Sequence, residues 1–185
     1  MAFDVSAFAA AGLPLGGARP SLFNVIIDTP AGVPNIGAQM SFSCRASSIP
    51  ASEITVIEQP YMGRRVPMAG TRNFSPWSIT VMNDEDFKLR HAFEVWMNGI
   101  NRHEANLRAQ AFRTNASYKG TGTVIQLSKT GRPIRTYSMV DLWPTSLGQI
   151  ELAWDNGDQI EEFSVEFRYT FWEPVAVSTT GTLAV

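Results

Sequence analysis

Residues 142–173 read LWPTSLGQIELAWDNGDQIEEFSVEFRYTFWE, and they predict more of the fold than any other stretch. After Glu161, apolar side chains alternate with acidic or polar ones, which is the period of an antiparallel strand with one buried face. The residues Asp155–Asp158 favour the left-handed backbone of a tight turn, so the stretch is predicted to be one long β-hairpin. The predicted apolar face comprises Phe163, Val165, Phe167, Tyr169 and Phe171, and the polar face Glu162, Ser164, Glu166, Arg168, Thr170 and Trp172.

The rest of the chain is predicted to add shorter strands joined by turns. Proline and glycine fill residues 30–37, which predicts a hairpin loop, and Lys129–Pro133 predicts a second one. The basic segment Tyr61–Gly70 is predicted to be a long exposed loop or ribbon. Together these features favour a mainly β (α+β) fold, an antiparallel β-sandwich or barrel-like domain with one flanking α-helix. The predicted strands lie at residues 22–29, 39–47, 53–59, 77–81, 121–127 and 134–142.

One helix is predicted, over about residues 84–99. Asn83 is a favourable N-cap, and the acidic run Asp84–Asp86 suits the positive end of the helix dipole. This acidic run is interpreted as a charged first turn rather than a metal site, because no ligand set of suitable spacing accompanies it. Residues 101–117 are expected to be irregular or partly helical. The apolar residues at helical spacing are Leu89, Phe93, Trp96 and Ile100.

The length of 185 residues favours a single domain. We expect an N-terminal arm over residues 1–20, a β domain over residues 21–174 and a C-terminal tail over residues 175–185. Cys44 is the only cysteine, so it cannot form an intramolecular disulfide, and its place in an alternating run predicts a buried thiol. No apolar run approaches the ~20 residues of a membrane helix. A soluble protein made in a cytoplasm is therefore expected.

The formal net charge of −2 conceals a segregation of charge along the chain. Residues 54–135 hold six acids and twelve bases, whereas residues 136–185 hold eight acids and one base, Arg168. A basic middle and an acidic end suit contacts between copies and a surface that repels polyanions. The alternative is that folding mixes both regions into an ordinary surface.

The motifs that could support catalysis are each better explained by structure. His103-Glu104 begins like a zinc-protease motif, but Leu107 stands where the second histidine belongs. Glu161 and Glu162 point to opposite faces of a strand, which excludes an acid/base pair. The sequence therefore predicts no catalytic residue, no metal site and no cofactor. A small hydrolase with an unrecognised site stays open as a remote alternative.

Several short sequence blocks occur in order between residues 20 and 174. Together they indicate one protein family more specifically than any single block does. The two most specific are Trp77–Asp84 (WSITVMND) and Leu142–Thr145 (LWPT). The others are Phe42–Ala46, Ile49–Pro50, Met62–Arg65, Gly70–Phe74, Leu152–Asp155 and Ile160. In these blocks the chain resembles the tail tube protein of contractile-tailed bacteriophages. The segment Pro30–Ala38 and the tail 175–185 depart from the family pattern.

This resemblance implies a structural subunit whose six-membered rings stack into a hollow tube inside a contractile sheath and form the conduit for genome delivery. The expected partners are further copies of the chain, the sheath protein, the tape-measure protein and baseplate proteins. DNA would pass through the lumen without specific binding. The expected location is the tail of the virion, assembled in the host cytoplasm. The alternative is the tube subunit of a type VI secretion system or a phage-tail-like injection particle.

The resemblance also suggests which residues meet other molecules. The segment Ser48–Gly70 is the candidate for contacts between stacked rings, with Arg64 and Arg65 reaching acids on the next ring. A solvated loop is the alternative interpretation of that arginine pair. The candidate stacking residues are Glu53, Tyr61, Arg64, Arg65 and Arg72. The candidate lumen-facing acids, which would repel the DNA backbone, are Glu151, Asp158, Glu162 and Glu166.

Overall fold

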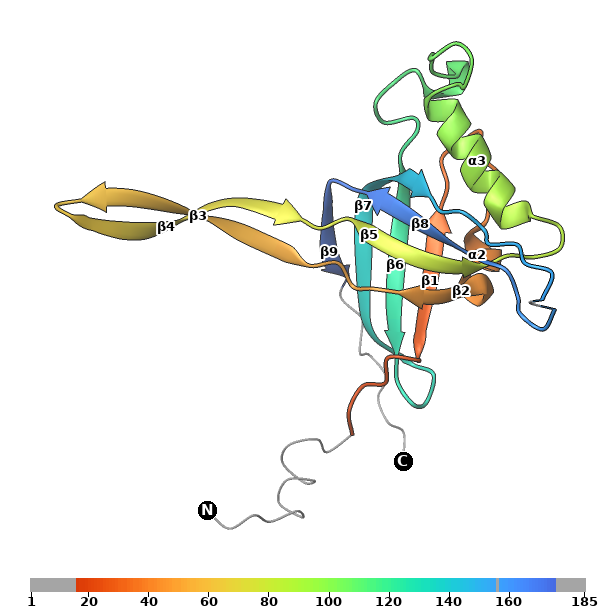
Figure 1. Cartoon of the computed structure of the whole chain (residues 1–185). Coiled ribbons are helices and arrows are strands. Elements are labelled where there is room, and N and C mark those ends of the chain that lie inside the picture. The colour runs from red at the N-terminus through yellow and green to blue at the C-terminus, as the bar shows by residue number, and fades with distance from the viewer. Residues whose placement is uncertain (1–15, 156, 176–185) are drawn as a thin grey trace.

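The computed structural model describes residues 16–155 and 157–175 (Figure 1). Within these residues the chain forms strands with few and short helices, so the predicted mainly β, antiparallel fold is confirmed. The elements follow in the order β1 (Phe23–Asp28), α2 (Gly37–Ser43), β2 (Cys44–Ser47), β3 (Ser52–Tyr61), β4 (Arg64–Phe74), β5 (Trp77–Met82), α3 (Lys88–Ile100), the 3₁₀ helix η2 (Gln110–Phe112), β6 (Gly120–Leu127), β7 (Pro133–Leu147), β8 (Glu162–Arg168) and β9 (Phe171–Val175).

Seven of these strands form one bent antiparallel sheet in the order β1-β6-β7-β8-β5-β2, with β9 also paired to β7. The long strand β7 joins the two halves of the sheet. Its first part pairs with β6 and β9, and its last part, from Trp143, pairs with β8. The change of partner follows Asp141, whose positive φ of 62° accompanies a register shift against β6. A β-bulge bends a strand in this way.

The core lies between the two halves of the sheet and is closed by α3. Phe93 on the helix packs edge to face against Phe163 and Phe167 of β8, with ring centroids 6.3 and 5.8 Å apart. Trp96 lies next to Phe167 and donates its indole N–H to the carbonyl oxygen of Tyr118 at 2.7 Å. The largest fully buried side chains are Trp77, Trp96, Phe93, Phe163, Phe167, Ile27, Met40, Ile79, Leu89, Met139, Leu142 and Val25.

The prediction of one long terminal hairpin is wrong in two respects. Strands β7 and β8 do pair, but β7 ends at Leu147 and β8 begins at Glu162, so a long connection, residues 148–161, separates the strands from the predicted turn at Asp155–Asp158. The second strand also ends at Arg168, because the N–H of Thr170 bonds the carbonyl oxygen of Val140 at 3.0 Å and the chain then pairs with the first part of β7. Phe171 consequently lies exposed on β9.

The predicted hairpin of residues 22–47 is also wrong. Strand β1 pairs with β6, and residues 37–43 form the helix α2 where a return strand was expected. The side chain of Asn35 accepts the N–H of Gly37 at 3.0 Å, and the N–H of Met40 bonds Ile36 at 2.8 Å, which starts the helical turn. Met40 is therefore buried, while Phe42, which strand alternation would bury with it, is 84% exposed.

The main helix begins later than predicted. Asn83 does not cap it. This residue lies five positions before Lys88, and its N–H and side-chain NH2 donate to the carbonyl and carboxylate oxygens of Glu161 at 2.8 and 2.9 Å, which keeps Asn83 beside the sheet. Phe87 takes a left-handed φ of 52°, and Asp84 accepts the N–H of Lys88 at 3.1 Å across this turn. Helix α3 therefore starts at Lys88, and the predicted helical spacing of its apolar residues is confirmed.

Other predictions agree with the structure. The β6–β7 hairpin, the irregular segment 101–117 and the exposed ribbon at 61–70 all occur. The predicted arm, residues 1–20, lies outside the described residues except for 16–20. The predicted tail, residues 175–185, lies outside them except for Val175.

Candidate assembly surfaces

Strands β3 and β4 form a two-stranded ribbon that projects from the body of the molecule (Figure 1). Its tip is the turn Met62-Gly63, where both residues have positive φ, 45° and 83°. Two positive φ values are what a tight hairpin turn requires. All residues of β3 are exposed, and β4 is exposed except for half-buried Gly70 and Phe74. The ribbon therefore contributes little to the core of its own subunit.

The two faces of the ribbon differ in chemistry. Side chains of directly opposite residues share a face, and successive residues alternate between faces. The register pairs Tyr61 with Arg64, Gln59 with Val66 and Ile57 with Met68, so these six residues share one face. We call it the apolar ribbon face, because Ile57, Tyr61, Val66 and Met68 expose large apolar side chains there. Arg64 is its one charged residue.

The opposite ribbon face holds an ion pair within the chain. Arg65 donates to Glu58 at 2.7 Å. Both side chains are more than half exposed, so this pair is a surface pair of small energetic value. Arg64 has no ion pair or hydrogen bond within the described residues. Glu53 and Arg72 lie near the base of the ribbon, opposite Asn73 and Ile54.

A second surface is the outer face of the sheet half formed by β2, β5 and β8. The inner residues of β8 are buried, whereas Glu162, Ser164, Glu166 and Arg168 point away from the core. Arg45 on β2 forms an ion pair with Glu162. The strand face is thus balanced in charge, with Arg45 and Arg168 against Glu162 and Glu166. Of the predicted lumen acids, Glu162 and Glu166 lie on this strand face.

The other two predicted lumen acids, Glu151 and Asp158, lie in the connection 148–161. Both ends of this connection are fixed to the body. At one end Gly148 donates to Ser164 at 2.7 Å and accepts from the Arg90 guanidinium at 3.1 Å. At the other end Glu161 accepts two hydrogen bonds from Asn83. A side chain at position 148 would overlap Ser164, so this close approach requires glycine.

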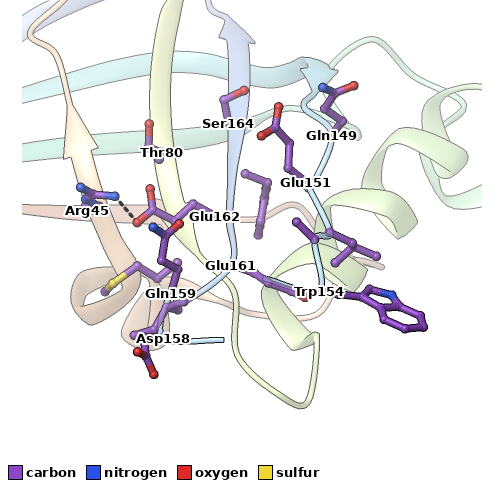
Figure 2. A pocket seen from close by; sticks show the side chains of 15 residues that line it. Arg45, Thr80, Gln149, Glu151, Trp154, Asp158, Gln159, Glu161, Glu162 and Ser164 are labelled. Atoms are coloured by element: carbon purple, nitrogen blue, oxygen red, sulfur yellow. Dashed lines mark hydrogen bonds and ion pairs between the residues drawn. The ribbon is translucent and has the colours of Figure 1, made fainter. Parts of the chain in front are cut away.

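Between its fixed ends the connection borders an open hollow of about 1090 Å³, which we call the acidic hollow (Figure 2). Four carboxylates, those of Glu151, Asp158, Glu161 and Glu162, line it against one guanidinium, that of Arg45. Glu161 and Glu162 are bonded to Asn83 and Arg45, whereas Glu151 and Asp158 have no such partner within the described residues. Large apolar side chains line it too, and those of Leu152, Trp154 and Ile160 are exposed by 79%, 104% and 67%.

Sequence reasoning missed the apolar part of this hollow. The predicted hairpin places Leu152 and Trp154 in its first strand, whereas both lie exposed in the connection after β7. The available signal was that both apolar residues lie between Glu151 and the turn-forming Asp155–Asp158 stretch.

Chemically reactive groups are few in the described residues. No group of three or more His, Cys, Asp or Glu side chains among residues 16–155 and 157–175 could hold a metal ion. Cys44 is partly rather than fully buried. This burial raises the pKa of its thiol to about 11, because the thiolate loses solvation. None of the helices in the described part of the chain has the length and apolar character needed to span a bilayer.

Comparison with known sequences identifies relatives along nearly the whole domain. A family described as phage tail tube protein matches residues 18–174. The tail tube protein gp19 of Enterobacteria phage T4 is 32% identical over 157 residues, covering 84% of this chain and 91% of the relative. The tail tube protein of Serratia phage KSP90 is 30% identical over 124 residues, covering 66% of this chain and 68% of that relative.

Comparison with solved structures shows the same fold at lower sequence identity. A chain of the anti-feeding prophage baseplate has a TM-score of 0.63 at 15% identity, covering 88% of this chain and 97% of its own length. A chain of the PVC sheath-tube complex in the extended state has a TM-score of 0.62 at 14% identity, covering 95% of this chain and 100% of its own length. The family match and the identity to phage relatives show that this chain belongs to the phage tail tube proteins, which are structural proteins of the tail and not enzymes.

Proposed function

We propose that six copies of this chain close into a ring and that the rings stack into a hollow tube, which conducts the genome inside a contractile sheath. The observation that carries this proposal is the two-faced sheet half of β2, β5 and β8, whose inner face is buried and whose polar outer face is free to line a channel. A relative of the same fold comes from a complex described as a sheath-tube complex.

The edges of the sheet support closure into a ring. Strands β1 and β2 lie at the two ends of the sheet order, so each has an edge without a strand partner within the described residues. An open edge invites pairing with another strand, and a closed barrel removes all such edges. Adjacent copies that join through these edges would form one continuous inner barrel.

The outer sheet face is the proposed lining of the lumen. Glu162 and Glu166 lie on it, while Glu151 and Asp158 lie in the connection at its end. Carboxylates on this surface would repel the phosphate backbone, so that DNA slides through the tube without being retained. Because the strand face is balanced in charge, the acidic excess comes from the connection.

The ribbon is the proposed contact between stacked rings, through Glu53, Tyr61, Arg64, Arg65 and Arg72. Its exposed apolar side chains and its separation from the core support this role. Sheath, tape-measure and baseplate proteins are the proposed partners, and the host cytoplasm the proposed place of assembly. The alternative, a tube subunit of a type VI secretion system or phage-tail-like particle, is less well supported because the relatives at 30% and 32% identity are phage tail tube proteins.

Negative-stain electron microscopy of the purified protein over a range of concentrations tests the proposal. Six-fold rings and hollow tubes are expected, and a monomer at every concentration would contradict it. The lumen assignment is tested with Glu166→Lys, which should still form tubes but retain DNA during purification. Glu104→Lys, the same charge change at an exposed site away from the sheet face, is the control.

A further inference from the structure

We propose that a β-bulge near the base of the ribbon sets the direction in which the apolar ribbon face points, and that the side chain of Thr55 fixes this bulge. The inference rests on the proposed function for the use of that direction, because a ribbon that joins stacked rings must present its contact face at one angle to the body. A contact face that is held at this angle before binding loses less freedom when it binds. Thr55 is thus a positioning residue, which acts through the backbone of β4.

The bulge lies where two residues of β4 stand opposite one residue of β3. The register shifts between Ile54 and Val56, so that Thr55 alone faces both Gly70 and Thr71. A bulge of this kind bends the longer strand and increases the local right-handed twist of the pair. Figure 1 shows the ribbon strongly twisted, with β3 and β4 crossing in the view. The outer part of the ribbon is therefore rotated relative to its base.

The hydroxyl of Thr55 bonds the backbone of the extra residue. Its Oγ1 accepts the N–H of Thr71 at 2.9 Å and donates to the carbonyl oxygen of Thr71 at 3.1 Å. These are the backbone groups that a bulge otherwise leaves outside the ladder. Gly70 permits the close approach, because a Cβ there would lie 2.5 Å from Thr55 Oγ1 and 2.9 Å from the Thr55 carbonyl oxygen. The three residues together hold the bulge at one position along the ribbon.

The base of the ribbon is fixed to the body of the subunit. The ring of Phe74 at the end of β4 packs edge to face against Tyr169 and Trp172, with ring centroids 6.1 and 6.4 Å apart. The Tyr169 hydroxyl donates to the carbonyl oxygen of Ser75, whose N–H donates to the carbonyl oxygen of Ala51. No third strand pairs with β3 or β4 within the described residues. The direction of the outer ribbon therefore depends on the twist between its two strands.

The bulge also separates the two tasks of strand β4. Met68 pairs with Ile57 and Phe74 with Ser52, and these partners lie five positions apart on β3, so they face opposite sides of the ribbon. In a regular strand Met68 and Phe74, six positions apart, would share one face. Because the bulge reverses the alternation, β4 packs Phe74 on its own subunit through one face and presents its outer apolar side chains on the other.

Deletion of Thr71 tests the bulge directly. It removes the extra residue but keeps every other cross-strand pair and every side chain of the apolar ribbon face. The protein concentration needed for tubes should rise by about tenfold or more, because the contact face points in another direction. The urea unfolding midpoint should stay native, since the ribbon lies outside the core. Native-like assembly of the deletion variant would overturn the proposal.

The role of the Thr55 hydroxyl is tested with matched substitutions. Thr55→Val keeps the shape of the side chain but loses both hydrogen bonds, and it should raise the concentration needed for tubes by less than the deletion does. Thr55→Ser keeps the hydroxyl and should assemble like the native chain. Thr71→Val is the control, because the hydroxyl of Thr71 makes no hydrogen bond within the described residues. Equal assembly of Thr55→Val and the native chain would overturn the role of Thr55.

A distance measured in dilute protein gives a result that does not depend on tubes forming. Spin labels on Gln59→Cys in the ribbon and Glu173→Cys on β9, in a Cys44→Ser chain, report the ribbon direction by pulsed electron paramagnetic resonance. The distance between the labels should shift when Thr71 is deleted and stay unchanged in Thr55→Ser. An unchanged distance in the deletion variant would overturn the proposal. A shifted distance, with no rings or tubes from the native chain, would retain the bulge as the positioning device and reject the proposed function instead.

Discussion

Asp141 is the residue at which β7 changes partners. Its φ of 62° is a conformation that most residues avoid and that Asn and Asp tolerate. Its carboxylate accepts from Lys119 Nζ and from the Thr170 hydroxyl, both at 3.0 Å. These bonds tie the bulge to the residue before β6 on one side and to the junction of β8 and β9 on the other. The hydrogen bond from Lys119 is the main reason that the pKa of Asp141 is lowered in the folded protein.

The lowered pKa predicts how Asp141 contributes to stability at different pH values. A carboxyl group with a lower pKa in the folded state stabilises the protein above its unfolded pKa, near 3.9, and loses this effect as the pH falls through the folded pKa. Asp141→Asn keeps the backbone tolerance but removes the charge. It should lower the free energy of unfolding at pH 7 by ~0.2–1 kcal/mol, since the carboxylate is 41% exposed.

Urea unfolding at several pH values measures this effect. The difference between the native chain and Asp141→Asn should shrink as the pH falls below about 4. Glu173→Gln, an exposed acid on β9, is the control and should leave the profile unchanged. Parallel profiles for Asp141→Asn and the native chain would show that the Lys119 pair contributes nothing.

At the scale of elements, helix α3 is locked to η2 by a glycine. Gly99 lies in the last turn of the helix, and a side chain there would overlap the ring of Phe112, which is 2% exposed. The backbone N–H of Ala109 also bonds the carbonyl oxygen of Gly99 at 2.9 Å. The irregular segment after the helix is therefore held in place by close backbone contact.

This contact predicts that Gly99→Ala is destabilising. Alanine favours a helix over glycine by up to ~1 kcal/mol, but the overlap with buried Phe112 should cost ~1–3 kcal/mol, so the overlap wins. Thermal unfolding should show a lower midpoint for Gly99→Ala. The drop in midpoint caused by Gly99→Ala should be smaller in a Phe112→Leu background than in the native chain. A rise in the midpoint for Gly99→Ala would contradict the packing described here.

The ribbon, by contrast, is an element without a core of its own. Replacing residues 57–68 with Asn-Gly joins Val56 to its cross-strand partner Ala69 through a turn sequence that favours hairpins. The free energy of unfolding should change by no more than ~0.5 kcal/mol, because the removed side chains are exposed. Electron microscopy should show no tubes. Tubes like those of the native chain would mean that the ribbon has no role in assembly.

At the scale of the whole molecule, the ribbon and the acidic hollow lie at opposite ends of the same sheet half. Of the five tryptophans, Trp77 and Trp96 are fully buried, whereas Trp154 is fully exposed on the connection 148–161. A large aromatic side chain left entirely in water is unusual in a folded protein. The exposure of Trp154 therefore reports directly on whether this end of the molecule is covered.

Fluorescence quenching by acrylamide can follow that covering. In dilute protein, Trp154→Phe should remove most of the readily quenched emission, because the other indoles are at least half buried. In native protein at concentrations where tubes form, the quenchable fraction should fall. Trp172→Phe is the control and should leave the change on assembly intact. An unchanged quenchable fraction in tubes would show that Trp154 stays in solvent after assembly and that this end of the molecule is not covered.

The sequence by itself determined what repeats locally. The alternation of Phe163, Val165 and Phe167 marked the buried face of β8, the helical spacing marked the buried face of α3, and proline and glycine marked the ribbon. Ordered blocks along residues 20–174 indicated the family. These features are local because the period of buried side chains follows directly from strand and helix geometry.

Only the tertiary structure decided where the elements end and what they pair with. Strand β8 stops because Thr170 bonds Val140, and helix α3 starts late because Asn83 bonds Glu161. Each of these bonds joins residues far apart in the chain, so no local period records it. Exposure at residues 148–161 was decided in the same way, since whether an apolar residue is buried depends on which other elements reach it.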